Sequence, residues 1–252
     1  MSGFNGYQGG DNLMNCARQL GAFQDKNGFL IDFGDDVAYE LSHRFFDFER
    51  YETENLADFD AIHVFMSEGE KVDVSVKNDD SEEVQIHLHG KTKIPNNVIF
   101  ETYIKKRILM VNIDLFADDK MTLDVKIPKK MLTSLHLDTL CAVNVSLGNG
   151  VSAKEIYING ASGSIEAKNI VYEKGEFFSV SGDIDLVVNA KSDIATEIST
   201  MKGDVAVQFL NVGKMEVETF SEYGSSSNCH VEGKGYKADV YVHSRDGDIK
   251  IR

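Results

Sequence analysis

Three aspartates stand in glycine turns at repeated positions in the second half of the chain. Asp183, Asp204 and Asp248 each follow a glycine and precede an apolar residue. Repeated turns bring such carboxylates to one face, and Ca²⁺ takes about six to eight oxygen ligands. Ser164 and Ser225 interrupt the row at equivalent positions. We therefore favour turn chemistry, in which glycine supplies a positive φ and aspartate bonds its own backbone, over a calcium site.

A second group that could do chemistry is the pair His87 and His89. Residues two apart on a strand share a face, so two imidazoles could bind one metal ion, with His63 or His43 as a third ligand. The spacing locates no further ligand. Solvent-facing histidines on a strand that buries its alternate residues explain the same pattern, and we prefer this interpretation.

A third candidate is the irregular segment after Gly224. An ungapped count places Ser226, Asn228 and His230 where the neighbouring repeat has inward-facing apolar residues. Either the strand slips and turns Cys229 inward, or it forms a bulge. Serine, cysteine and histidine are nucleophile and base types. Adjacent residues on a strand point to opposite faces, however, which argues against a Cys229–His230 pair. We assign no catalytic, cofactor-binding or metal-binding residue.

The elements that position these residues follow from the turns themselves. Glycines 163, 182, 203 and 247 are separated by 19 (163 to 182), 21 (182 to 203) and 44 (203 to 247) residues, and the last gap holds a degenerate copy around Gly224. A period of this size indicates a stack in which each unit buries its apolar side against its neighbours. The sequence therefore predicts an all-β, single-stranded parallel β-solenoid with rungs of roughly 21 residues.

Each unit contains a leading and a trailing strand with apolar residues at every second position, which predicts burial of one face. We expect the leading strands to align Leu135, Ile156, Phe177 and Ile198 in register. The trailing strands are expected to point a second set inward, namely Val143, Val145, Ile165, Ala167, Ile184, Leu186, Val205, Val207, Ile249 and Ile251.

The N-terminal segment, residues 1–59, has a different pattern. Apolar residues recur at helical spacing after Asp11, and again from Asp35 to about Tyr51, where Val37, Leu41, Phe45 and Phe48 form one stripe. We predict short helices that cap the open end of the solenoid. The solenoid itself is expected to occupy 60–252, with its clearest repeats in 132–252.

Composition excludes several partners. The formal net charge is −15, which disfavours nucleic acid and anionic membranes because both need a basic surface. The apolar runs are too short to span a bilayer, and the start of the chain lacks the features of a signal peptide. These features predict the cytoplasm by default. The three cysteines show no paired spacing and are expected to be idle or buried thiols.

The segment from Leu123 to Thr139, with Pro128 ahead of the repeats, and the Gly-Asp turns resemble the putative adhesin family, a bacterial group of β-solenoid domains of unknown function. The resemblance covers approximately 60–252. It implies a β-helix, suggests the cell surface, and supplies no catalytic residues to transfer.

These observations favour a non-enzymatic structural or interaction module with a protein or glycan partner. The alternative is a carbohydrate-active β-helix enzyme that uses the surface carboxylates Asp183, Asp185 and Asp204. The chain stops within the strand that ends at Arg252. An uncapped C-terminal rung of this kind would favour coverage by the N-terminal helices or by a second copy of the protein.

Overall fold

The computed structural model describes residues 45–67, 71–116, 119–228 and 231–252. Strands make up most of this part, with a single 3-10 turn at Pro95–Asn97. The strands are β1 (Phe46–Asn55), β2 (Ala61–Met66), β3 (Lys71–Asp79), β4 (Glu83–Thr92), β5 (Ile99–Lys105), β6 (Ile108–Asp114), β7 (Lys120–Pro128), β8 (Leu132–Leu147), β9 (Ala153–Ser162), β10 (Ile165–Ile170), β11 (Lys174–Ser181), β12 (Ile184–Asn189), β13 (Ile194–Lys202), β14 (Val205–Leu210), β15 (Val212–Ser221), β16 (Ser226–Ser227), β17 (Tyr236–Asp246) and β18 (Ile249–Ile251).

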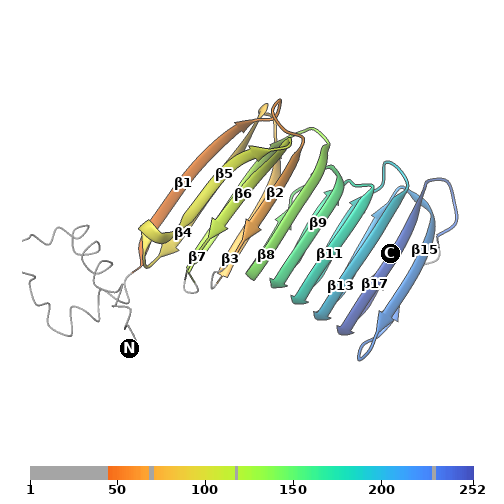
Figure 1. Cartoon of the computed structure of the whole chain (residues 1–252). Helices are drawn as coiled ribbons and strands as arrows, with labels where there is room; N and C mark the ends of the chain where they lie inside the picture. The colour runs from red at the N-terminus through yellow and green to blue at the C-terminus, as the bar shows by residue number, and fades with distance from the viewer. Residues whose placement is uncertain (1–44, 68–70, 117–118, 229–230) are drawn as a thin grey trace, which may run out of the picture.

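The strands form two sheets, and each rung of the solenoid contributes one strand to each (Figure 1). The leading sheet has the order β5-β6-β2-β8-β9-β11-β13-β17-β15. The trailing sheet has the order β1-β4-β7-β3-β8-β10-β12-β14-β18-β16. The long strand β8 passes through both sheets. The predicted parallel β-solenoid is thus confirmed.

The core lies between the sheets and is filled by the residues at every second strand position. All the trailing-strand residues that the sequence pattern predicts to face inward, from Val143 to Ile251, are buried. Burying one Ile, Leu or Val side chain contributes about 1.5–3 kcal/mol. The stacked rows of these residues are therefore the main source of stability.

The leading strands differ in one respect from the predicted alignment. Leu135 pairs with Ile156, and Phe177 with Ile198, as expected. Ile158, rather than Ile156, lies opposite Phe177. The predicted register is therefore wrong by two residues at this step. A shift of two keeps each side chain on its face, so the core pattern is unchanged.

The end of the stack that contains β1 is antiparallel. β1 pairs with β4, β4 with β7, and β5 with β6. The helix predicted up to about Tyr51 is wrong from Phe46 onward, because these residues form β1. Hydrogen bonding to β4 and burial of Phe48 hold this segment at the sheet edge. The rest of the predicted helical region, up to residue 44, lies outside the described residues.

The order of the rungs in space differs from their order in the chain at both ends (Figure 1). The rung of β17 and β18 lies between the rung of β13 and β14 and the rung of β15 and β16. The rung of β2 and β3 likewise lies between β8 and the rung of β6 and β7. The C-terminal rung is therefore not the uncapped end of the stack, and that premise for self-association is wrong. The outermost rung here is the irregular one.

The glycine turns approach one another too closely for a side chain. Gly203 has φ +143°, and a Cβ there would lie 2.3 Å from the carbonyl oxygen of Gly182. A Cβ at Gly182 would meet the carbonyl oxygen of Gly163 in the same way, at 2.2 Å. These positions require glycine for both its conformation and the space it leaves.

We expect Gly203→Ala to lower the free energy of unfolding by at least about 1–3 kcal/mol, because it adds backbone strain and a clash with the neighbouring rung. Gly233→Ala is the matched control, since nothing lies within 4 Å of a Cβ there. The control should change stability by less than about 0.5 kcal/mol. Urea denaturation of both variants measures the difference, and equal stabilities would contradict the argument.

Candidate functional site

The Gly-Asp turns form a ladder of hydrogen bonds between rungs. Asp204 donates its backbone N–H to Oδ1 of Asp183, and Asp248 donates its own to Oδ1 of Asp204, both at 2.8 Å. Ser225 extends the ladder by donating its backbone N–H to Oδ1 of Asp248 at 2.8 Å. The aspartates thus cap the turn of the next rung. The expectation that they bond their own backbone is corrected.

This ladder assigns the carboxylates a structural role. The backbone N–H and the hydroxyl of Ser225 hold the pKa of Asp248 below its ordinary value. Ser164, at the equivalent position, donates its backbone N–H to Oδ1 of Asn144 at 3.2 Å. Asn144 therefore takes the place of an aspartate at this turn, and Ser164 receives its cap from the neighbouring rung. Calcium binding by these turns stays untested.

Asp204→Ala should lower the free energy of unfolding by roughly 0.5–1.5 kcal/mol, because the N–H of Asp248 loses its acceptor. Asp204→Asn keeps an oxygen at that position and should retain most of the stability. Chemical denaturation with and without Ca²⁺ compares the variants with the parent. If Asn is as damaging as Ala and Ca²⁺ stabilises only the parent, the negative charge is needed and the calcium interpretation gains support.

The predicted shared face of His87 and His89 is confirmed, because their rings stack with centroids 4.3 Å apart. One of the two predicted third ligands, His63, is not found beside them. His63 lies in the leading sheet, where it stacks on His136 with centroids 4.1 Å apart. His43 lies outside the described residues. The residue that does join the pair is Asp124 of β7, whose Oδ2 lies 3.2 Å from Nε2 of His89.

The His63–His136 stack is half-buried, and both imidazoles have lowered pKa values. Burial is the larger cause for each, and proximity to His136 lowers the pKa of His63 further. A histidine with a lowered pKa binds fewer protons in the folded state than in the unfolded state. Its contribution to stability is therefore present above the ordinary histidine pKa of about 6.5 and is lost as the pH falls below it.

Acidification from about pH 7.5 to about pH 5.5 should lower the melting temperature of the parent protein more than that of His136→Gln, which removes one such group. His63→Gln should act in the same direction, because it removes the other. Differential scanning fluorimetry at matched ionic strength provides the comparison. An identical pH dependence in all three proteins would contradict the prediction.

The irregular rung is only partly described. Ser226 lies opposite Ile249, as the ungapped count predicts, and its side chain is exposed. Its position in the outermost rung explains why an apolar residue is not required there. Cys229 and His230 lie outside the described residues, so the slip, the bulge and the nucleophile pair stay untested.

Cys141 is the one cysteine within the described ranges, and its thiol is free. It is buried at the corner of β8, and burial raises its pKa to about 11. The thiol is therefore neutral and unreactive at ordinary pH. This confirms the prediction of an idle, buried thiol for this residue.

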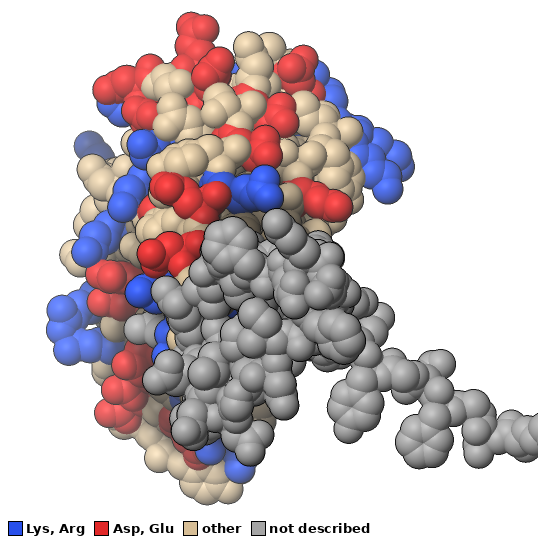
Figure 2. Space-filling model, turned by 90° about the vertical axis from the view of Figure 1, so that its left-hand side faces the viewer, with Lys and Arg blue, Asp and Glu red and all other residues tan. Residues whose placement is uncertain are grey.

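The sequence patterns gave no indication of a hollow on the outer face of the leading sheet. It has a volume of about 470 Å³ and lies across β11, β13, β17 and β15. Its lining includes five carboxylates and a tyrosine: Glu176, Glu197, Glu216, Glu218, Asp239 and Tyr241. Acidic groups thus predominate here. At the opposite end of the stack, Figure 2 shows acidic and basic side chains interspersed.

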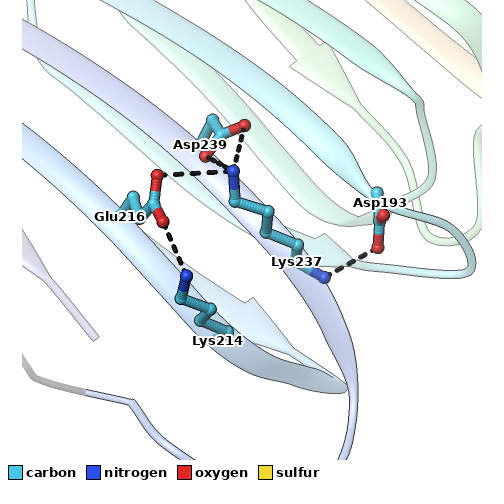
Figure 3. A network of polar contacts seen from close by, with 5 residues as sticks. All are labelled: Asp193, Lys214, Glu216, Lys237 and Asp239. Carbon is cyan, nitrogen blue, oxygen red and sulfur yellow. Dashed lines mark hydrogen bonds and ion pairs between the residues drawn. The ribbon is translucent and has the colours of Figure 1, made fainter.

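A network of ion pairs fixes one side of this hollow (Figure 3). Lys237 Nζ lies 2.9 Å from Oδ1 of Asp239 and 3.3 Å from Oε2 of Glu216, and Lys214 Nζ lies 2.7 Å from Oε1 of Glu216. Lys214, and after it Lys237, holds the pKa of Glu216 below its ordinary value. The backbone N–H of Lys237 donates to Oδ1 of Asp193 at 2.9 Å, which ties β17 to the turn before β13.

The other side of the hollow carries a row of side chains that face solvent. Glu197, Tyr241 and Glu218 occupy directly paired positions on β13, β17 and β15. Tyr241 is 42% exposed, and neither glutamate forms an ion pair within the described part of the chain. Neighbouring strands lie about 4.8 Å apart, so the ring stands between two carboxylates. An aromatic face flanked by carboxylates is suited to an ammonium or guanidinium group.

A sequence signal for this row exists but is weak. The three residues occupy outward-facing positions of leading strands, at the same register. Because β17 lies between β13 and β15, their proximity does not follow from chain order.

The three carboxylates considered for a carbohydrate-active enzyme do not line this hollow. Asp183 and Asp204 belong to the turn ladder, whereas Asp185 is an exposed residue of β12, paired with Glu166 and Ala206. No contact of these three in the described residues indicates catalysis.

The chain matches the Toastrack DUF4097 family over residues 57–252 and belongs to that family. Among solved structures it is similar to one described as a putative cell adhesion protein from Clostridium sporogenes ATCC 15579, with 12% identity, a TM-score of 0.50, and coverage of 81% of this chain and 97% of the other. It is also similar to a putative adhesin from Bacteroides fragilis NCTC 9343, with 14% identity, a TM-score of 0.48, and coverage of 84% and 98%. At this identity the first likeness concerns the fold. No curated protein matches the chain. No helix in the described ranges is long and apolar enough to cross a membrane.

Proposed function

We propose that this Toastrack-family protein is a non-enzymatic interaction module, and that it binds a basic segment of a partner protein in the hollow of the leading sheet. The row of Glu197, Tyr241 and Glu218 carries the proposal. It presents an exposed aromatic ring between two carboxylates that form no ion pair within 4.0 Å among the described residues. The net charge of −15 favours the approach of a cationic partner.

The expected energies agree with a binding surface made of several weak contacts. A cation over a partly exposed tyrosine contributes about 0.5–1 kcal/mol, and a hydrogen bond to a charged group about 1.5–3 kcal/mol. One lysine or arginine would therefore bind weakly. A partner segment with several basic residues, placed along the hollow, would bind more tightly because it could reach both Glu197 and Glu218.

The rigidity of the surface supports the same proposal. Three of the lining strands have a hydrogen-bonded neighbour on both sides, and the Lys237 network fixes Glu216 and Asp239 before any partner arrives. A surface that is already ordered loses little conformational entropy on binding. A neutral glycan partner would need the tyrosine but not the carboxylates of Glu197 and Glu218. A carbohydrate-active enzyme remains the alternative from sequence, and no observation in the described residues favours it.

The test uses a fluorescent decalysine peptide as the probe, with binding measured by anisotropy at about 150 mM salt so that long-range attraction is screened. The parent protein should bind the peptide. The double variant Glu197→Gln, Glu218→Gln should weaken binding by at least about tenfold, because two charge-assisted contacts are lost. Tyr241→Ala should weaken binding as well.

The matched control is Glu166→Gln, Asp185→Asn, which removes the same charge from the outer face of the trailing sheet. This control should bind the peptide as the parent does. Equal loss in both double variants would mean that only net charge matters and would overturn the proposal. Preference of the parent for neutral oligosaccharides over the peptide would overturn it in favour of a glycan partner.

A further inference from the structure

The antiparallel end of the trailing sheet brings two histidines and a carboxylate together on its outer face. Tyr51 of β1 and Asp124 of β7 lie opposite His87 of β4, one on each side. Glu49 lies opposite His89 in the same way. Residues two apart on a strand share a face, so all of these side chains leave the sheet on one side.

The potential ligand atoms of His87, His89 and Asp124 lie within 4.8 Å of one another. Within the described residues, this is the one group of three histidine, cysteine or acidic side chains that is arranged to hold a metal ion. His89 Nε2 lies 3.2 Å from Oδ2 of Asp124, and His87 Nε2 lies 3.1 Å from Oε1 of Glu49. Both imidazoles therefore direct the same nitrogen toward carboxylate oxygens.

Aromatic stacking restricts the orientation of the imidazoles. The ring of His87 lies between the rings of Tyr51, at 3.8 Å and 8°, and His89, at 4.3 Å and 24°. The histidine side chains are partly covered, with exposed fractions of 21% for His87 and 39% for His89. The stacked rings thus point both nitrogens to the same side and leave them accessible to an ion from solvent.

We propose that His87, His89 and Asp124 form a binding site for a divalent transition-metal ion, of which Zn²⁺ is the best match, with Glu49, which contacts His87, as a further oxygen ligand. Two imidazoles and a carboxylate are a ligand set that Zn²⁺ accepts, whereas Ca²⁺ and Mg²⁺ require oxygen ligands. Cysteine ligands, which would favour softer ions, are not part of this cluster.

The geometry requires only small movements. Zinc–ligand bonds of about 2.0–2.1 Å place tetrahedral ligand atoms roughly 3.3 Å apart. The three ligand atoms would therefore approach one another by no more than about 1.5 Å, which rotation of partly exposed side chains allows. Ion pairs of such exposed groups contribute about 0–1 kcal/mol, so their replacement by metal bonds costs little.

The position of the site gives the ion a structural consequence. Its ligands come from β4 and β7, and Glu49 comes from β1, which forms the edge of the trailing sheet. An ion held by these residues would cross-link the antiparallel strands at the end of the stack. Metal binding to the folded state alone would then raise the melting temperature.

The experiment titrates the EDTA-treated full-length protein with Zn²⁺ by isothermal calorimetry. The expected result is one site that binds with a dissociation constant of about 10 µM or tighter. His89→Gln and Asp124→Asn should each weaken binding by at least about tenfold, because each removes a direct ligand. Glu49→Gln should have a smaller effect.

The matched control is His63→Gln, which removes a histidine from the leading sheet and should leave Zn²⁺ binding unchanged. Melting temperatures in EDTA identify any variant that is merely unfolded. Co²⁺ provides a second measurement, since the visible absorption of the bound ion reports its coordination and should be lost in His89→Gln. Binding weaker than about 1 mM, or equal binding by the parent, His89→Gln and Asp124→Asn, would overturn the proposal.

Discussion

The close stacking of glycine turns is the constraint on which the rest of this solenoid depends. Each turn donates and accepts hydrogen bonds across the rung boundary, and the carbonyl oxygen of each glycine also accepts a hydroxyl group from the next rung. Ser179 does this for Gly163 at 3.0 Å, and Ser244 for Gly203 at 3.2 Å. These contacts set the register of the turns. The register in turn places the buried rows of the core and the exposed rows of the leading sheet.

The sequence predicted the repeating part of this arrangement well because one physical period controls it. The trailing-strand residues that alternation predicts to face inward, from Val143 to Ile251, are all buried, and the glycine spacing identified the rungs. The same reasoning missed the two-residue shift opposite Phe177, because such a shift leaves the buried face unchanged. It also predicted a helix up to about Tyr51, where Phe46–Asn55 form β1. Of the apolar stripe that suggested the helix, only Phe48 lies in this strand. The order of the rungs at either end could not be predicted from the sequence, because strands that pair in space need not be consecutive in the chain.

The candidate sites were likewise predictable from the sequence only in part. A period of two was sufficient to place His87 and His89 on one face. Asp124 joins them only through the antiparallel pairing of β4 with β7, which a sequence separation of 35 does not reveal. Glu197, Tyr241 and Glu218 become neighbours because a later strand lies between two earlier ones. Both sites thus arise where the simple succession of rungs breaks down.

The interleaved rungs also affect how this end of the chain can fold. During synthesis β15 leaves the ribosome before β17, yet β17 is the strand on which β15 packs. Rungs therefore cannot be added one at a time in the order of translation, as an ideal linear repeat would allow. The outermost rung must wait for the segment that follows it, and the two rungs must form together. The last two rungs of such a stack fold cooperatively. The stack therefore cannot be shortened simply by removing its last repeat.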